Sequence, residues 1–213
     1  MEKSPLSNWK AILKQFLQIV YTPLKEKGYK WAVIGSMASV LQGVPVIPKD
    51  LDIIVVNPKI VYFIAELLVD FTPEKKTGNS FEDEVCFSSK EQPVYEGRDD
   101  YDYFWVFGRW KLGDADLEIA HITAPEGFLE SEDHDWIWEA GPEIWPFIRS
   151  ESFEGYEIPV VPLEIQLETN SSRGMEERAD QIVKILLTKG YDKMLLQKAL
   201  CKNCTKKYQD MIA

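Results

Sequence analysis

The sequence of 213 residues predicts an α+β fold, in which helices flank a mixed β-sheet. Two short apolar segments, 30–34 and 50–56, have the character of buried strands and lie close together in the chain. The segment between them holds only a short helix, predicted over 36–41, which is too short for an ordinary parallel crossover. A mixed sheet therefore suits this spacing better than a sheet whose strands are all parallel.

Helices are predicted on both sides of these strands. Residues 6–22 are expected to form an amphipathic helix, because apolar side chains recur there every three or four residues. We expect Pro23 to interrupt this helix and Gly28 to close its last turn. The Asn-Pro pair that opens 57–70 is typical of a helix start, and a helix is predicted there.

The second half of the chain predicts further strands and a helical end. Segments 101–107 and 110–122 are predicted as two strands joined near Gly108 and Arg109. Towards the end, residues 175–200 predict one or two helices that are broken at Gly190.

These elements predict a main domain over 1–165 and a C-terminal helical segment over 166–213. Within the main domain, 72–100 is expected to be an insert of hairpin and loops. Residues 124–156 combine tryptophans, acids and Gly/Pro breaks, which is typical of a compact subdomain or lid.

Composition restricts the class of protein. Hydrophobic residues make up 45% of the chain, enough for a core, and 35 acids against 24 bases give a net charge of −11. This charge argues against indiscriminate binding to DNA, other nucleic acid or an anionic membrane. The chain has no run of about 18 apolar residues and its start lacks a signal-peptide core, so we expect a soluble, cytoplasmic protein.

The three cysteines are too few for a disulfide framework. Cys201 and Cys204 have C-x-x-C spacing, but a zinc site needs about four ligands, and the other soft candidates, Cys86, His121 and His134, lie far away in sequence. Reduced thiols are the preferred interpretation, and a redox or metal-binding pair is the alternative.

Carboxylates are the main candidates for chemistry, because the familiar P-loop, dinucleotide, zinc-protease and nucleophile-elbow motifs are absent from the sequence. Asp50 and Asp52 alternate at the start of an apolar strand, so both side chains leave the same face. Such paired charges favour a divalent cation, and oxygen ligands favour Mg²⁺ or Mn²⁺. The alternative is that both acids are solvated at the strand end.

Gly35 and Ser36 form a second candidate feature, at the junction of a strand and a helix. Such a junction points backbone N–H groups at an anion, glycine permits close approach, and the serine hydroxyl adds a hydrogen bond. Taken alone, the pair is more typical of a tight turn with a helix cap. Its position upstream of Asp50 and Asp52 predicts a phosphate site next to a metal site.

A third acid is expected on the strand over 110–122, where Asp114, Asp116 and Glu118 alternate on one face. Glu118 lies deepest in the apolar part, whereas Asp114 stands at the strand entrance, where a solvated role suits it. An exposed strand face is the alternative interpretation for any one of them.

The segment 31–36 and the later Asp50-Leu51-Asp52 together resemble the defining motif of the nucleotidyltransferase superfamily, which has the polymerase-beta-like fold. In that motif a Gly-Ser pair precedes two acids that are separated by one apolar residue. The resemblance extends to 110–122 and 156–187, where the sequence is similar to small bacterial and archaeal members of the superfamily.

The resemblance implies a nucleotidyltransferase-like fold and transfer of a nucleoside monophosphate from an NTP to a hydroxyl acceptor, with release of pyrophosphate. It implies that Asp50, Asp52 and Glu118 hold two Mg²⁺ or Mn²⁺ ions, with Asp116 as the alternative third acid. Gly35 and Ser36 would then hold the triphosphate. The acceptor could be a small molecule, an RNA end or a protein side chain.

Weaker candidates surround this motif. Arg173 could neutralise phosphate, and so, with less support, could Arg178. Trp136, Trp138 and Trp145 could stack on a base or an acceptor, although core packing is more typical of tryptophan. The alternative function is a catalytically inactive module of the same fold that binds a nucleotide or a protein, as in toxin–antitoxin relatives.

Overall fold

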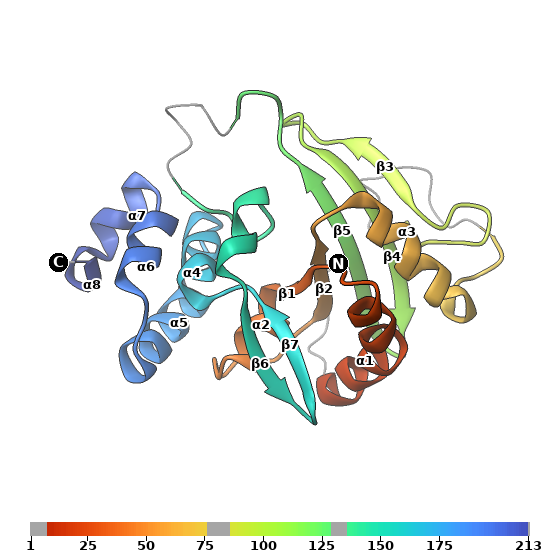
Figure 1. Ribbon diagram of the computed structural model, residues 1–213. Helices are drawn as coiled ribbons and strands as arrows, with labels where there is room; N and C mark the ends of the chain where they lie inside the picture. Colours follow the sequence, from red (N-terminus) through yellow and green to blue (C-terminus); the bar gives the residue numbers. More distant parts are fainter. Residues whose placement is uncertain (1–7, 76–85, 129–135, 213) are drawn as a thin grey trace.

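The computed structural model describes residues 8–75, 86–128 and 136–212, and it has the expected α+β architecture (Figure 1). Seven strands form one mixed sheet in the order β3-β4-β5-β2-β1-β7-β6. Two neighbouring pairs, β1 with β7 and β2 with β5, are parallel, and the others are antiparallel. The strands are β1 Trp31–Ile34, β2 Asp50–Val55, β3 Tyr95–Arg98, β4 Phe104–Leu112, β5 Ala115–Thr123, β6 Arg149–Phe153 and β7 Tyr156–Val160.

Helices cover both faces of this sheet. Helices α1 and α3 pack on one face, where they share an apolar core with alternate residues of β1, β2, β4 and β5. The other face packs against α4, α6 and the segment around the 3-10 helix η2. The helices are α1 Trp9–Glu26, α2 Gly35–Leu41, α3 Pro58–Leu67, α4 Leu163–Ser172, α5 Glu176–Lys189, α6 Lys193–Ala199, α7 Lys202–Lys207 and α8 Gln209–Ile212, with the 3-10 helices η1 Val69–Phe71 and η2 Pro142–Phe147. None of the helices in the described ranges is both long and apolar enough to cross a membrane.

Helix α1 runs through Pro23, so the expected interruption there was wrong. The residue after the proline, Leu24, is fully buried in the core and holds the last turn in place. The helix ends at Glu26, and Gly28 closes it: its φ of +64° suits glycine, the Gly28 N–H donates to the Lys25 carbonyl, and the Tyr29 N–H donates to the Leu24 carbonyl. These two bonds form a Schellman motif, as the glycine had indicated.

The turn between β4 and β5 lies at Gly113 and Asp114, so its expected position near Gly108 and Arg109 was wrong. Gly113 has a φ of +63°, which the first position of a two-residue type II′ hairpin turn requires. Gly108 lies inside β4, where a Cβ atom would collide with the Trp110 ring and lie 2.9 Å from Ser88 Oγ. Gly108 is therefore required by packing inside a strand, although a glycine at this position of the sequence had indicated a turn.

The β6–β7 hairpin occupies the end of the segment 124–156, for which we had expected a subdomain or lid. Its strands pair across a turn at Glu154 and Gly155, and β7 continues the sheet beside β1. Residues 129–135 of that segment, and 76–85 of the expected insert, lie outside the described residues.

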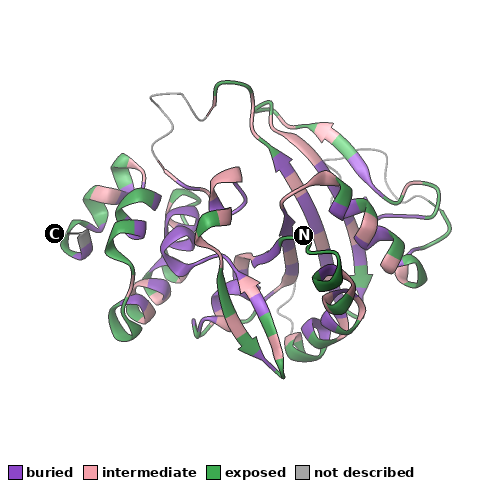
Figure 2. Cartoon of the chain, viewed as in Figure 1, coloured by how far each residue is buried: buried purple, intermediate pink, exposed green. Residues whose placement is uncertain are grey.

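The C-terminal helices pack around α4, which is buried on all sides over 163–170. Helices α4 to α8 share an apolar cluster of their own, and Figure 2 shows their outer turns exposed. The expected break at Gly190 is confirmed, because α5 ends one residue before it. The expected domain boundary at 165/166 falls within α4.

A buried ion pair connects the β6–β7 hairpin to these helices. The Glu164 side chain is fully buried, and its two oxygens accept hydrogen bonds from Arg149 Nη1 at 3.0 Å and Nη2 at 2.9 Å. Oε1 also accepts the backbone N–H of Asp192 at 2.8 Å, at the start of α6. One carboxylate thus joins β6, α4 and α6.

We predict that Arg149→Ala lowers the free energy of unfolding, because it leaves the Glu164 charge buried without a cation. Loss of one partner from a fully buried pair costs about 3–5 kcal/mol. Because the Arg149 side chain is 40% exposed, we expect about 2–3 kcal/mol in urea unfolding. Arg98→Ala, which removes an exposed ion pair with Asp102, is the control and should cost less than about 1 kcal/mol. Equal losses for the two variants would contradict the anchoring role of Glu164.

Candidate functional site

The register of β2 and β5 brings the predicted acids onto neighbouring strands. The two strands are parallel, and Asp50 lies opposite Asp116 while Asp52 lies opposite Glu118. These side chains share the sheet face of Ile54 and Ala120, which packs towards the C-terminal helices.

A cavity of about 380 Å³ lies on this face, between the sheet and the helices α4 and α5. The residues that the sequence analysis favoured for the site all line it: Gly35, Ser36, Asp50, Asp52, Glu118 and Arg173. Arg178, which the sequence ranked lower, lines it as well. The alternative third acid, Asp116, is not among the lining residues and forms an ion pair with Lys111. The fold thus brings residues of α2, β2, β5 and α5, and the residue directly after α4, to one cavity.

Gly35 begins α2 directly after β1, and two separate constraints favour glycine there. Its φ is +64°, and a Cβ atom would lie only 3.0 Å from Asp52 Oδ2. Ser36 follows it and is buried, with 4% of its surface exposed. The Gly-Ser pair and Asp52 are therefore in close proximity, as their sequence pattern had suggested.

Glu139 is a site residue that sequence reasoning missed. It is buried, with 4% of its surface exposed, and its Oε2 accepts the backbone N–H of Gly35 at 3.1 Å. Its Oε1 lies 3.6 Å from Nη1 of Arg173. The Glu139 carboxylate therefore contacts two of the three residues that were predicted to bind phosphate, Gly35 and Arg173. No motif or spacing marked Glu139, because its partners lie 104 and 34 residues away.

Burial raises the pKa of the Glu139 carboxyl group above its ordinary value of 4.5. The positive charges of Arg173 and Arg178 and the N–H group of Gly35 act in the opposite direction, but burial is the largest of these effects. The protonated form of Glu139 is therefore favoured relative to a solvated glutamate.

Glu118 is held by an arginine from the neighbouring strand. Arg109 lies opposite Glu118 in the β4–β5 pairing and donates to Glu118 Oε2 from Nε at 3.0 Å and from Nη2 at 2.5 Å. Across residues 8–75, 86–128 and 136–212, the carboxylate oxygens of Asp50, Asp52 and Glu118 do not all lie within 4.8 Å of one another. The three acids share a cavity, with Glu118 oriented towards the guanidinium group.

A second, largely aromatic pocket of about 590 Å³ adjoins this cavity and shares Trp105, Trp138 and Arg173 with it. Its aromatic lining consists of Tyr101, Tyr103, Trp105, Phe128, Trp136 and Trp138. Of the three tryptophans considered for stacking, Trp136 and Trp138 line this pocket. Trp145 packs against the apolar cluster between the sheet and the helices α4 and α6.

Comparisons with known proteins show the fold of the chain. No protein-family model and no curated protein matches the sequence. Among solved structures, a provisionally assigned nucleotidyltransferase from Thermotoga maritima is 24% identical, with a TM-score of 0.52, over 88% of this chain and 98% of that one. The chain therefore has the nucleotidyltransferase fold that its motif had predicted.

Two further structures match with lower scores. The lincosamide antibiotic adenylyltransferase LnuA, solved with lincomycin bound, is 14% identical over 85% of this chain and 99% of that one, with a TM-score of 0.45. The antibiotic-resistance factor ANT(2'')-Ia is 12% identical over 96% of this chain and 95% of that one, with a TM-score of 0.46.

We predict that Glu139→Gln changes the pH dependence of stability. Because the pKa of Glu139 is raised on folding, its contribution to stability is fully present below its ordinary pKa and is lost as pH rises through the folded value. The free energy of unfolding of the unsubstituted protein, minus that of the variant, should therefore fall as pH rises above about 4. Urea unfolding at a series of pH values measures this difference. Glu66→Gln, at an exposed position of α3, is the control, and a pH-independent difference for Glu139→Gln would contradict the prediction.

Proposed function

We propose that this protein is a metal-dependent nucleotidyltransferase, which transfers a nucleoside monophosphate from an NTP to a hydroxyl acceptor and releases pyrophosphate. The observation that carries the proposal is the shared cavity of Asp50, Asp52 and Glu118 beside Gly35 and Ser36, within a nucleotidyltransferase fold. Few other side chains in this cavity could act as nucleophiles, which suits phosphoryl transfer, where positioning and charge stabilisation dominate.

The donor set fits Mg²⁺ or Mn²⁺. Asp50 and Asp52 offer carboxylate oxygens from one face of β2, and Glu118 offers another from the adjacent strand. Asp50 and Asp52 would hold the metal on the triphosphate, and Glu118 would share a second ion after releasing or sharing Arg109. Two bound cations stabilise the attacking and leaving oxygens of an in-line displacement.

The chain's other residues would hold the triphosphate. Gly35, Ser36 and Arg173 all line the same cavity, and their backbone N–H, hydroxyl and guanidinium groups are donors suited to phosphate oxygens. Glu139 now accepts from Gly35 and pairs with Arg173, so a bound triphosphate would take over these contacts. Arg178 adds positive charge on the same side.

The aromatic pocket is the best candidate for the acceptor site. It shares Trp138 and Arg173 with the cavity, so an acceptor bound there would lie next to the nucleotide. Its volume of about 590 Å³ is within the range of pockets that bind small organic molecules. This size favours a small-molecule acceptor over an RNA end or a protein side chain.

We predict that Asp52→Asn lowers nucleotidyl transfer from labelled NTP at least about a thousand-fold, because it removes a charge that holds the cation. The assay screens each labelled NTP against small-molecule, RNA and protein acceptors from cell extract. Asp114→Asn, in the exposed β4–β5 turn, is the matched control and should retain full activity. Transfer at the unsubstituted rate by a folded Asp52→Asn protein would refute the proposal.

The same assay distinguishes the two candidate third acids. Glu118→Gln should cause a loss similar to that of Asp52→Asn, whereas Asp116→Asn should have a much smaller effect. The reason is that Glu118 lines the cavity while Asp116 pairs with Lys111 outside it. The reverse order of effects would move the third ligand to Asp116.

An inactive nucleotide-binding or protein-binding module of this fold is the second candidate. It is favoured by the internal contacts of two predicted site groups, the Gly35 N–H group with Glu139 and Glu118 with Arg109. Calorimetry separates the two candidates. For an enzyme we predict NTP binding at least about ten-fold tighter with Mg²⁺ than with EDTA, since Asp50 and Asp52 would hold the triphosphate through the cation. Affinity that is independent of Mg²⁺ would favour the inactive module.

A further inference from the structure

Cys201 and Cys204 lie at the start of α7, away from the cavity described above. Cys201 is the N-cap residue of this helix, and its Sγ accepts the backbone N–H of Cys204 at 3.5 Å. The Sγ atoms of the two cysteines lie within 4.8 Å of each other. The C-x-x-C spacing thus places two thiol groups close enough to bind one metal ion.

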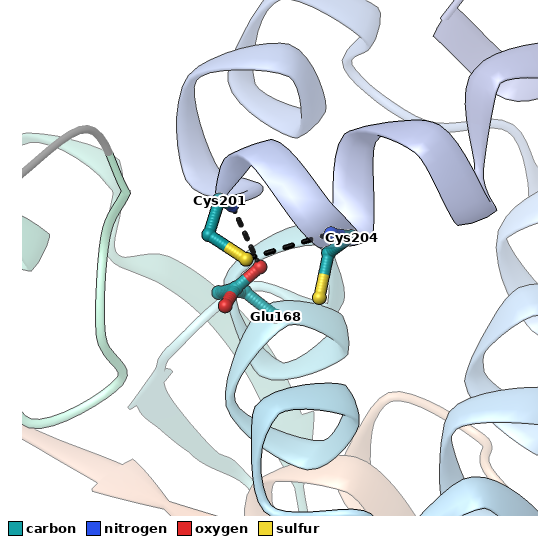
Figure 3. Close-up of side chains that lie close together, drawn as sticks. All are labelled: Glu168, Cys201 and Cys204. Carbon is teal, nitrogen blue, oxygen red and sulfur yellow. Dashed lines mark hydrogen bonds between the residues drawn. The ribbon is translucent and has the colours of Figure 1, made fainter.

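Glu168 on α4 adds a third donor to this pair. A carboxylate oxygen of Glu168 and the Sγ atoms of Cys201 and Cys204 all lie within 4.8 Å of one another (Figure 3). The backbone N–H of Cys201 donates to Glu168 Oε2 at 2.9 Å, and the Ser172 hydroxyl donates to Oε1. These hydrogen bonds fix the carboxylate beside the thiols.

Glu168 differs from the two other buried glutamates among the described residues, because each of those forms an ion pair with an arginine. Glu139 pairs with Arg173 and Glu164 pairs with Arg149. Glu168 is only 1% exposed, and among the described residues no basic side chain forms an ion pair with it. A buried carboxylate without a cation is costly, and a bound divalent ion would supply the missing charge.

We propose that Glu168, Cys201 and Cys204 form a binding site for Zn²⁺ or a metal ion of similar softness. Thiolate ligands select such ions over Mg²⁺, so this site is chemically distinct from the one formed by Asp50, Asp52 and Glu118. In tetrahedral coordination the ligand atoms would lie about 3.3–3.8 Å apart, which small side-chain rotations from the present positions can reach.

The surroundings of the site support this proposal. Glu168 also lines the aromatic pocket, and a water molecule from that pocket would supply the fourth ligand. Because thiols lose their protons when they ligate a metal, binding should strengthen as pH rises. The bound ion would join α7 to the buried helix α4 and so stabilise the C-terminal helices.

A Co²⁺ titration of the full-length, reduced and metal-free protein tests the proposal. We expect one equivalent of Co²⁺ to produce sulfur-to-cobalt charge-transfer absorption, which Zn²⁺ then removes by displacement. Cys201→Ser or Cys204→Ser should weaken binding at least about 100-fold, and Glu168→Gln at least about ten-fold. Cys86→Ala is the matched control, because this buried cysteine packs in a different cluster, and it should bind as before. Circular dichroism confirms that each variant is folded.

Several outcomes would overturn the assignment. One is the absence of a charge-transfer band in the unsubstituted protein. The others are an undiminished band in Cys201→Ser and an unchanged Co²⁺ affinity in Glu168→Gln. A second measurement needs no variant: Zn²⁺ should raise the melting temperature of the metal-free protein, and Mg²⁺ at the same concentration should not do so through this site. Recovery of the pair as a disulfide that excludes Co²⁺ would identify a redox pair instead. None of these readouts depends on nucleotidyl transfer, so the proposed function can fail without affecting them.

Discussion

The parallel pairing of β2 with β5 is the constraint on which the rest of the site depends. This register sets Asp52 opposite Glu118 and Asp50 opposite Asp116, so four carboxylates occupy one patch of the sheet. Like charges so close together are unfavourable, and the structure compensates with bases on β4: Arg109 contacts Glu118 and Lys111 contacts Asp116. Three acids of this patch, Asp50, Asp52 and Glu118, also line the cavity.

Buried glutamates connect this sheet to the C-terminal helices. Glu139 reaches back to Gly35 at the end of β1, and Glu164 joins the β6–β7 hairpin to α6. Glu168 joins α4 to the start of α7. Ligand binding at one of these carboxylates would consequently affect how the helices are held.

Much of the fold was predictable because it follows from local patterns. Short, continuous apolar segments identified β1 and β2, and the cap at Asn57 with the break at Gly190 gave two helix boundaries. Pro23 and Gly108 misled, because their effects depend on what surrounds them. Burial of Leu24 carries α1 past its proline, and the Trp110 ring requires the absence of a side chain at Gly108.

The sequence by itself determined the candidate acids, the Gly-Ser pair and the thiol pair, since each depends on residues only one to three positions apart. Only the tertiary structure decided which distant groups meet them. Arg109 at Glu118 depends on a hairpin register, while Glu139 at Gly35 and Glu168 at the two cysteines depend on long-range packing. Such contacts leave no periodic signal in the chain, because loops and helix packing, and not spacing, bring the partners together.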